Sequence, residues 1–297
     1  MSARLIGSIA AVALVVAGCG SSPGADPQQP GGKVAVVAST NVWGSVAQAV
    51  GGDQVDVKSI LKDPSADPHS YSSSATDATE LKNAKVAVYN GGGYDDFFTG
   101  MVNESGKDAR KVVAFDLSGK PEGGNEHVWY DLPTVKKVAD KIAEELGAVA
   151  PDRKDAFTKN AQAFNGKLDE LTAKAARIGK AKPGLQVVVT EPVPEYLLQA
   201  AGVKDATPEA FTKAVEEETD PPATAIAQTT DLVKNKQVAA LVNNEQTETP
   251  VTNQLGDAAK AAGIPVVQVT ETLPEGVGGY VDWMTKQVDD LSSALTR

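Results

Sequence analysis

Short runs of β-branched residues recur along the first half of this chain, and stretches with helical character separate them. The strand-like runs cover 33–40, 55–61, 85–90 and 111–117, and polar–apolar stretches with helical character cover 76–84 and 94–104. Continuous apolar strands that alternate with helices are typical of a parallel sheet covered on both faces. The pattern therefore predicts an α/β fold.

The second half of the chain repeats this pattern. Strand-like runs cover 185–190, 238–244 and 264–270, "GVKDA" is a weaker fourth strand, and helical patterns lie near 208–218, 223–235, 250–262 and 279–295. Two lobes of ordinary domain size agree with the length of the chain. We therefore expect an N-terminal α/β lobe over 33–151 and a C-terminal α/β lobe over 180–297.

Residues 152–179 lie between the two halves and carry a single apolar stripe. Apolar residues recur there at alternating steps of four and three, at Phe157, Ala161, Phe164, Leu168, Leu171, Ala175 and Ile178. Such positions share one face of an α-helix. A helix of this length spans about 42 Å and could run along both lobes. The alternative is an ordinary surface helix that is broken at Gly166.

The N-terminus has the features of a bacterial export signal. Arg4 precedes the apolar segment "LIGSIAAVALVVA", which is long enough for export but short for a membrane span. The segment ends in "VVAGC", which resembles a lipobox, so we expect a signal peptide over 1–18 and a lipid on Cys19. Residues 19–32 are rich in Gly, Pro and Ser and are predicted to form a flexible tether.

Composition narrows the range of partners. The formal net charge of −11 argues against nucleic acid or anionic lipid and suits a domain that meets cations. Cys19 is the only cysteine, which excludes an internal disulfide and a cysteine-based metal cluster.

Four metal-competent residues follow predicted strands. The only two histidines are His69 in "DPHSY" and His127 in "NEHVWYD", after the second and fourth runs of the first half. Glu191 and Glu271 directly follow the first and last runs of the second half. Ligands of open parallel sheets bind beyond the carboxyl ends of the strands. If both sheets face one cleft, the four side chains converge there.

Such a convergence would suit a divalent metal ion. Neutral imidazole and carboxylate both bind first-row divalent ions, and two carboxylates offset the charge of a dication. Four protein ligands with no open position would carry an ion rather than activate water. Binding should weaken as the pH falls below the ordinary imidazole pKa of ~6.5.

Each residue also has a simpler interpretation. A loop histidine is commonly a solvated side chain, and Glu191 is a credible helix cap. The acidic run over 213–222 is expected to be a solvated helix end, and Glu245 is expected to cap a helix rather than approach the cleft.

The chain resembles the cluster A-I solute-binding proteins of ABC transporters for zinc and manganese. The pieces that carry the resemblance are "STNVWGSVAQAVGGDQVDVKSIL", "DPHSYSSSATDATELKNAKVAVYNGGGYDDFF", "NEHVWYDLPTVKKVADKIAEEL", "TEPVPEYLLQAAGV" and "TETLPEGVGGYVDWM". They run in family order over nearly all of 34–296. The resemblance implies two Rossmann-like lobes with parallel sheets, joined by one long rigid helix.

The resemblance also implies a set of four metal ligands. His69 and His127 fall on the two histidines of the family, and Glu191 falls where members carry His or Glu. Glu271 stands where members usually carry Asp, so the longer side chain puts this ligand in question and leaves Glu275 as a substitute. Zn²⁺ and Mn²⁺ both remain open, with iron as a further alternative, and the Glu at 191 slightly favours Mn²⁺. Asp67 and Asp131 are candidates for orienting the imidazoles, or for cap and turn roles.

The resulting hypothesis is a lipid-anchored protein on the extracytoplasmic face of the membrane. It would act as a monomer, capture a divalent ion and deliver it to an ABC-transporter permease, without catalysing a reaction. Three alternatives remain at this point. They are a binding protein for an organic ligand, a metalloenzyme with Glu191 or Glu271 as general base, and an adhesive surface lipoprotein.

Overall fold

A computed structural model describes residues 32–63, 68, 69 and 71–296. The expected signal peptide, the lipidated Cys19, nearly all of the tether and Asp67 lie outside the described residues. No helix in the described part of the chain combines the length and apolar character needed to cross a membrane.

The N-terminal lobe is built on a four-stranded parallel sheet with the order β2-β1-β3-β4. Its elements are β1 (Val34–Thr40), α1 (Asn41–Gly51), β2 (Val55–Leu61), α2 (Ala75–Asn83), β3 (Val86–Tyr89), α3 (Asp96–Glu104), β4 (Arg110–Val113), α4 (Ala114–Ser118) and α5 (Leu132–Val149). Neighbouring β1 residues pack on opposite faces of the sheet, Val36 in the core with α1 and α5 and Val37 in a cluster with α2 and α3. The sheet is thus covered on both faces, as its apolar strands predict.

The C-terminal lobe repeats this topology with the strand order β6-β5-β7-β8. Its elements are β5 (Gln186–Val189), α7 (Glu195–Ala201), β6 (Lys204–Asp205), α8 (Glu209–Glu216), α9 (Ala223–Lys234), β7 (Leu241–Asn244), α10 (Pro250–Ala262), β8 (Val266–Val269) and α11 (Tyr280–Leu295). The ends of α10 are set by local chemistry. Thr249 and Thr252 form a capping box at its start, and Gly263 adopts the left-handed conformation that ends it.

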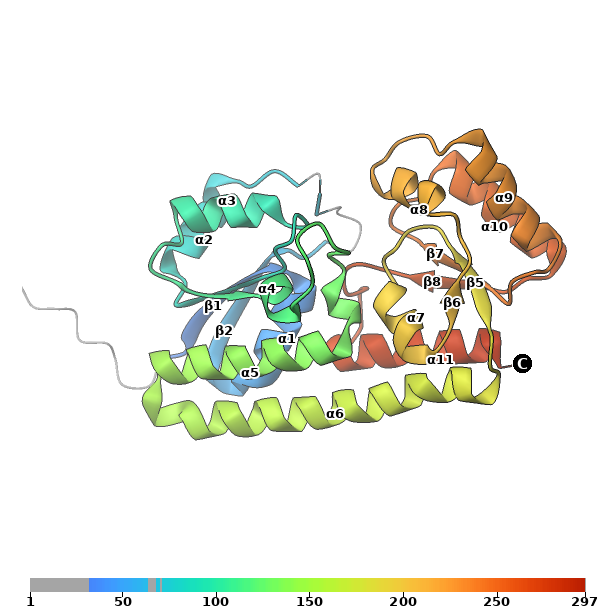
Figure 1. Cartoon of the computed structure of the whole chain (residues 1–297). Helices are drawn as coiled ribbons and strands as arrows, with labels where there is room; N and C mark the ends of the chain where they lie inside the picture. The colour runs from blue at the N-terminus through green and yellow to red at the C-terminus, as the bar shows by residue number, and fades with distance from the viewer. Residues whose placement is uncertain (1–31, 64–67, 70, 297) are drawn as a thin grey trace, which may run out of the picture. The chain divides into compact units, whose positions relative to one another are not determined.

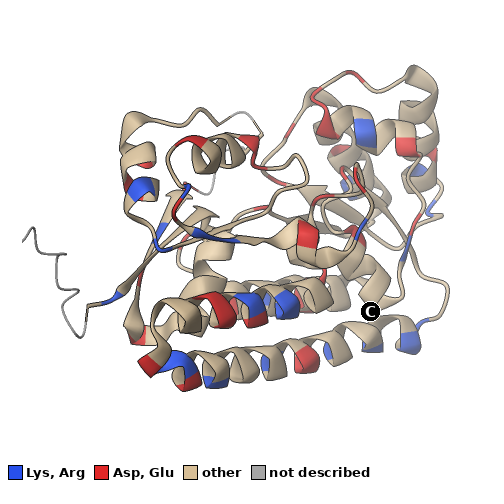
Figure 2. Cartoon of the chain, turned by 60° about the vertical axis from the view of Figure 1, so that its left-hand side comes forward, with Lys and Arg blue, Asp and Glu red and all other residues tan. Residues whose placement is uncertain are grey.

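One long helix, α6 (Lys154–Ala181), connects the lobes, and α11 lies alongside it (Figure 1). The seven stripe positions predicted from the sequence are its buried residues, and the helix continues through Gly166. Figure 2 shows charged residues distributed along α6. The apolar stripe belongs to a continuous core that includes residues of both lobes. The predicted α/β architecture with a long linking helix is therefore confirmed.

Gly179 allows the end of α6 to approach the second lobe closely. A Cβ atom at this position would lie 2.6 Å from the carbonyl oxygen of Ala201, at the end of α7. Because that neighbour is backbone, it cannot rotate away as a flexible side chain would.

Two local expectations need revision. Strand β4 ends at Val113, and the rest of the predicted strand 111–117 forms α4. Beyond Val113 the backbone N–H of Phe115 still donates to the carbonyl of Asn90, one residue past the end of β3, while the chain turns into the helix. Helix α5, with Pro133 in its first turn, was not among the predicted helices.

Candidate metal centre

All four predicted ligands line one pocket at the carboxyl ends of the two sheets. The pocket has a volume of about 500 Å³ and is lined by His69, Gly93, Glu126, His127, Glu191, Glu216, Glu217, Glu218, Thr247 and Glu271. The first lobe contributes both imidazoles, and the second contributes the carboxylates of Glu191 and Glu271. The four side chains thus share one pocket, as the strand ends suggested, and coordination of an ion by these four residues stays a prediction.

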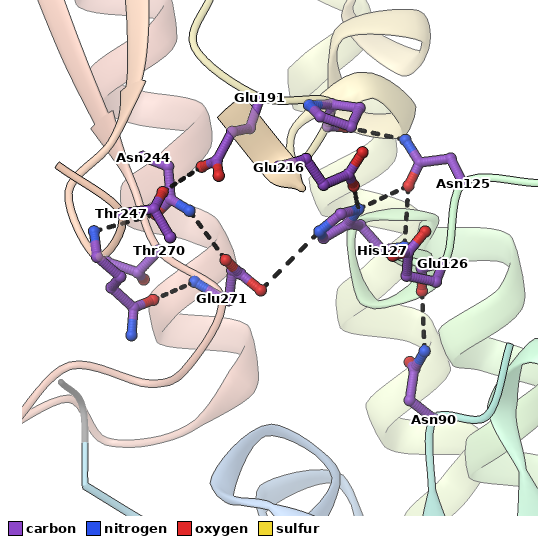
Figure 3. Close-up of polar contacts among 12 residues, drawn as sticks. Asn90, Asn125, Glu126, His127, Glu191, Glu216, Asn244, Thr247, Thr270 and Glu271 are labelled. Atoms are coloured by element: carbon purple, nitrogen blue, oxygen red, sulfur yellow. Dashed lines mark hydrogen bonds and ion pairs between the residues drawn. The ribbon is translucent and has the colours of Figure 1, made fainter. Parts of the chain in front are cut away.

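His127 is almost completely buried, with 1% of its surface exposed, and its ring is held in one orientation. The Oδ1 atom of Asn125 lies 2.7 Å from Nδ1 of the ring and also accepts a hydrogen bond from the His127 backbone N–H at 2.9 Å. An amide oxygen can only accept, so Nδ1 carries the hydrogen of the neutral ring. The lone pair then resides on Nε2, which faces Glu271 (Figure 3).

Glu271 has one carboxylate oxygen held and the other turned toward His127. Its Oε1 atom accepts a hydrogen bond from Nδ2 of Asn244 at 2.9 Å, and its backbone N–H donates to Gln246. Its Oε2 atom lies 3.9 Å from Nε2 of His127. Glu271 thus reaches the pocket despite being one methylene longer than the Asp typical of the resembling proteins.

Glu191 is buried to a similar degree and enters the pocket from the end of β5. Only 3% of its surface is exposed, and Oε2 accepts a hydrogen bond from the hydroxyl of Thr247 at 2.5 Å. The capping role considered from the sequence does not apply directly, because α7 begins four residues later, at Glu195. Its side chain instead faces the pocket beside Thr247.

His69 follows β2 in the chain, lines the same pocket and is exposed. Its ring meets the ring of Tyr94 edge-on, with centroids 5.1 Å apart. Tyr94 in turn lies 6.1 Å from the His127 ring and 4.4 Å from the Trp129 ring. A buried aromatic side chain therefore contacts both imidazoles and supports their position.

The pocket also contains carboxylates that the sequence did not identify as ligands. Glu126, His127 and Glu216 each place a potential ligand atom within 4.8 Å of the others. Oε1 of Glu216 lies 3.8 Å from Nδ1 of His127, the nitrogen that already donates to Asn125. That nitrogen therefore offers no lone pair to an ion on the Glu216 side. The expectation of a merely solvated acidic helix end is wrong for Glu216, which lines the pocket at the end of α8.

Burial and crowding of like charges shift the protonation of two neighbouring groups. Burial, helped by the nearby His69, lowers the pKa of His127 to about 3. Burial, helped by Glu126, Glu191 and other carboxylates, raises the pKa of Glu216 to about 8. At neutral pH the ring is therefore neutral, as coordination requires, and Glu216 is largely protonated.

The other sequence candidates among the described residues do not line this pocket. Glu275 is exposed and does not line the pocket, while Glu245 lines a different one beside α11. Asp131 accepts a hydrogen bond from Thr134 and pairs with Lys120 at 3.5 Å. The residue that orients the His127 ring is Asn125 rather than Asp131, and the signal for it was its place two residues before the histidine.

Comparison with known proteins agrees with the geometry of the pocket. The family model described as the periplasmic zinc-uptake complex component A (ZnuA) matches residues 36–294. The chain belongs to this family. The resemblance to zinc and manganese solute-binding proteins that was drawn from the sequence is thereby confirmed.

Curated relatives are similar in sequence to part of this chain. The iron ABC transporter substrate-binding lipoprotein MtsA of Streptococcus pyogenes serotype M1 is 30% identical over 190 residues, which cover 59% of this chain and 61% of that protein. The manganese ABC transporter substrate-binding lipoprotein PsaA of Streptococcus pneumoniae serotype 4 is 29% identical over 210 residues, covering 65% of this chain and 67% of that protein. The match thus spans about three fifths of the length of MtsA.

A solved structure agrees over a larger part of the chain. The periplasmic zinc-binding protein TroA of Treponema pallidum superposes with a TM-score of 0.75 at 21% identity, covering 90% of this chain and all of that one. At this identity the similarity establishes a shared fold.

Proposed function

We propose that this protein is the extracytoplasmic solute-binding component of an ABC transporter. Its pocket captures one divalent transition-metal ion, Zn²⁺ or Mn²⁺, and the protein delivers the ion to a membrane permease. The observation that carries the proposal is the orientation of His127, whose hydrogen-bonded Nδ1 leaves Nε2 facing a buried carboxylate. The same proposal includes a monomer that is anchored to the membrane by a lipid on Cys19.

The charge of the pocket supports a cationic ligand. Six glutamates and two histidines are among the described residues that line it, and none of those lining residues is Lys or Arg. Bringing an anionic or neutral organic molecule into such a pocket would leave the carboxylates without a counter-charge. A dication offsets them, and family membership makes ion transport the natural context.

The proposed ligands are His69, His127, Glu191 and Glu271. Two nitrogens and two carboxylates suit both Zn²⁺ and Mn²⁺, and the additional carboxylates of the pocket favour the harder Mn²⁺. The names of the relatives point to three ions, since MtsA is named for iron, PsaA for manganese and TroA for zinc.

Thermal unfolding of chelator-treated protein tests the proposal. An ion that binds only the folded chain at one hundred times its Kd should add about 2.7 kcal/mol of stability. We expect Mn²⁺ and Zn²⁺ to raise the melting temperature of the wild type and of Glu170→Gln, a control on the exposed side of α6. His127→Ala should lose most of that rise.

The outcomes separate the proposal from its alternatives. A wild-type melting temperature that neither ion moves would refute metal capture. A rise of equal size in wild type and His127→Ala would place the ion elsewhere. A protein that binds an organic ligand would keep its affinity for that ligand in His127→Ala. A metal-capture protein would have no affinity for such a ligand in either form.

A further inference from the structure

Asn125 connects the loops that carry two of the proposed ligands, one from each lobe. Its Oδ1 atom accepts from the backbone N–H and from Nδ1 of His127, in the first lobe. Its Nδ2 atom donates to the carbonyl of Pro192 at 2.9 Å and to Oε2 of Glu195 at 2.7 Å, in the second. Its own carbonyl accepts from the hydroxyl of Tyr196 at 2.6 Å. One side chain therefore spans the two lobes.

The orientation of this amide has no alternative with the same hydrogen bonds. Pro192 offers a carbonyl oxygen and Glu195 a carboxylate, and both can only accept, so the amide nitrogen must face them. The amide oxygen must then face the backbone N–H of His127, which can only donate. With the oxygen fixed beside Nδ1, the neutral imidazole is held with its hydrogen on Nδ1 and its lone pair on Nε2.

Asn125 acts beside the ion pocket rather than in it. It is not among the residues that line the pocket with the two histidines. It lines a neighbouring pocket of about 460 Å³, together with Pro192 and Glu195. Its effect on an ion would therefore pass through His127 and through the loop that follows Glu191.

We propose that Asn125 is a positioning residue that fixes the tautomer of His127 and ties the Glu191 loop to it across the two lobes. This inference deepens the proposed function and rests on it for the ion. Because Oδ1 of Asn125 holds the hydrogen on Nδ1 of His127, the lone pair of Nε2 faces the pocket before any ion binds. Through the nitrogen, the Pro192 backbone beside Glu191 is held at a fixed distance from the ring.

The chain offers a matched control in Asn41. Its Nδ2 atom donates to the carbonyl of Leu273 at 3.0 Å, and its Oδ1 atom accepts from the Leu273 backbone N–H at 2.9 Å. Leu273 lies two residues after Glu271, so Asn41 also joins the first lobe to a ligand loop of the second. Within the described part of the chain its amide bonds Leu273 and contacts no imidazole. Asn41→Ala thus removes a bridge between the lobes without removing a partner of His127.

Nitrogen-15 NMR of the ion-free chain reads the tautomer directly. The chain contains only two histidines, so a His69→Gln variant assigns the His127 signals. We expect Nδ1 to carry the hydrogen in wild type and in Asn41→Ala. In Asn125→Ala the ring should lose this preference and populate the Nε2–H form. Asn125→Asp keeps the accepting oxygen but loses the donors to Pro192 and Glu195, so its Nδ1 should stay protonated.

Mn²⁺ titration of the same variants measures the consequence for the ion. Loss of an outer hydrogen-bond partner of a metal-binding histidine typically lowers metal affinity 10–100-fold, and we expect a loss in this range for Asn125→Ala. An Asn125→Ala chain that is folded by circular dichroism and keeps the Nδ1–H form would overturn the inference. An Asn125→Ala chain whose Mn²⁺ affinity equals that of a wild type that binds Mn²⁺ would also overturn the inference. A wild-type chain that binds neither Mn²⁺ nor Zn²⁺ would instead refute the proposed function, while the tautomer comparison still decides the role of Asn125.

Discussion

Acidification of the ion-free protein should reduce its stability through His127. Burial lowers the pKa of this ring from 6.5 to about 3. As the pH falls, the unfolded chain takes up the proton first, so the contribution of the neutral ring is fully present above pH 6.5 and is lost toward pH 3. At 1.36 kcal/mol per pH unit the full contribution is about 5 kcal/mol, and about 2 kcal/mol of it is lost by pH 5.

Urea unfolding of chelator-treated wild type and His127→Gln between pH 5 and pH 7.5 measures this contribution. The carboxylates that titrate in this range are present in both proteins, so the difference between the two isolates the ring. We expect the free energy of unfolding of wild type to fall by about 2 kcal/mol more than that of the variant. His69→Gln, which changes the exposed histidine, should keep the full wild-type loss. Equal losses in wild type and His127→Gln would refute the assigned burial of a neutral ring.

The same burial limits proton competition at one of the two proposed imidazole ligands. An ordinary imidazole would make ion binding weaken below a pH of ~6.5. Because the pKa of His127 is lowered to about 3, proton competition at this proposed ligand begins only in strong acid. His127 is therefore ready to coordinate throughout the physiological range.

Further predictions concern the linking helix and the acidic wall of the pocket. Gly166→Ala should raise the free energy of unfolding by about 0.5–1 kcal/mol, because a Cβ atom at this position has open space around it. Gly179→Ala should lower the free energy of unfolding, because its Cβ atom would lie 2.6 Å from a backbone oxygen. Thermal denaturation of the two variants measures both effects. Glu271→Gln should weaken Mn²⁺ binding at least tenfold in calorimetric titration, and the exposed Glu275→Gln should leave it unchanged, so equal effects would contradict the ligand assignment. Ion binding at pH 7 should release more protons from wild type than from Glu216→Gln, because the raised pKa of about 8 keeps Glu216 protonated; calorimetry in buffers of different ionisation enthalpy counts them.

The fold was largely predictable because its signals are local. The run over 55–61 coincides with β2, and the pattern over 250–262 coincides with α10, whose caps are coded by neighbouring residues. Helix α5 carried a comparable signal, with Pro133 in its first turn. The end of β4 could not be read from its apolar run, because that run continues without a break through Ala114 and Phe115 into α4.

The candidate site was predictable to the extent that strand ends define it. Glu191 and Glu271 were found because each follows a strand, and His127 was found because it lies in the segment after the predicted strand 111–117, although α4 comes between β4 and this histidine. Glu216 was not found, because it enters from the end of a helix and becomes a pocket residue only through the packing of the lobes. Asn125 was missed although it stands two residues before His127, because its other partners at Pro192 and Glu195 lie 67 and 70 residues away in the sequence.

A crystal structure of the Mn²⁺-soaked or Zn²⁺-soaked protein, with anomalous data collected at the absorption edge of the metal, tests the central claim most directly. We predict one anomalous peak per chain, about 2.0–2.3 Å from Nε2 of His127 and within coordination distance of His69, Glu191 and Glu271. A peak bound through Nδ1 of His127, or one outside this pocket, would contradict the account.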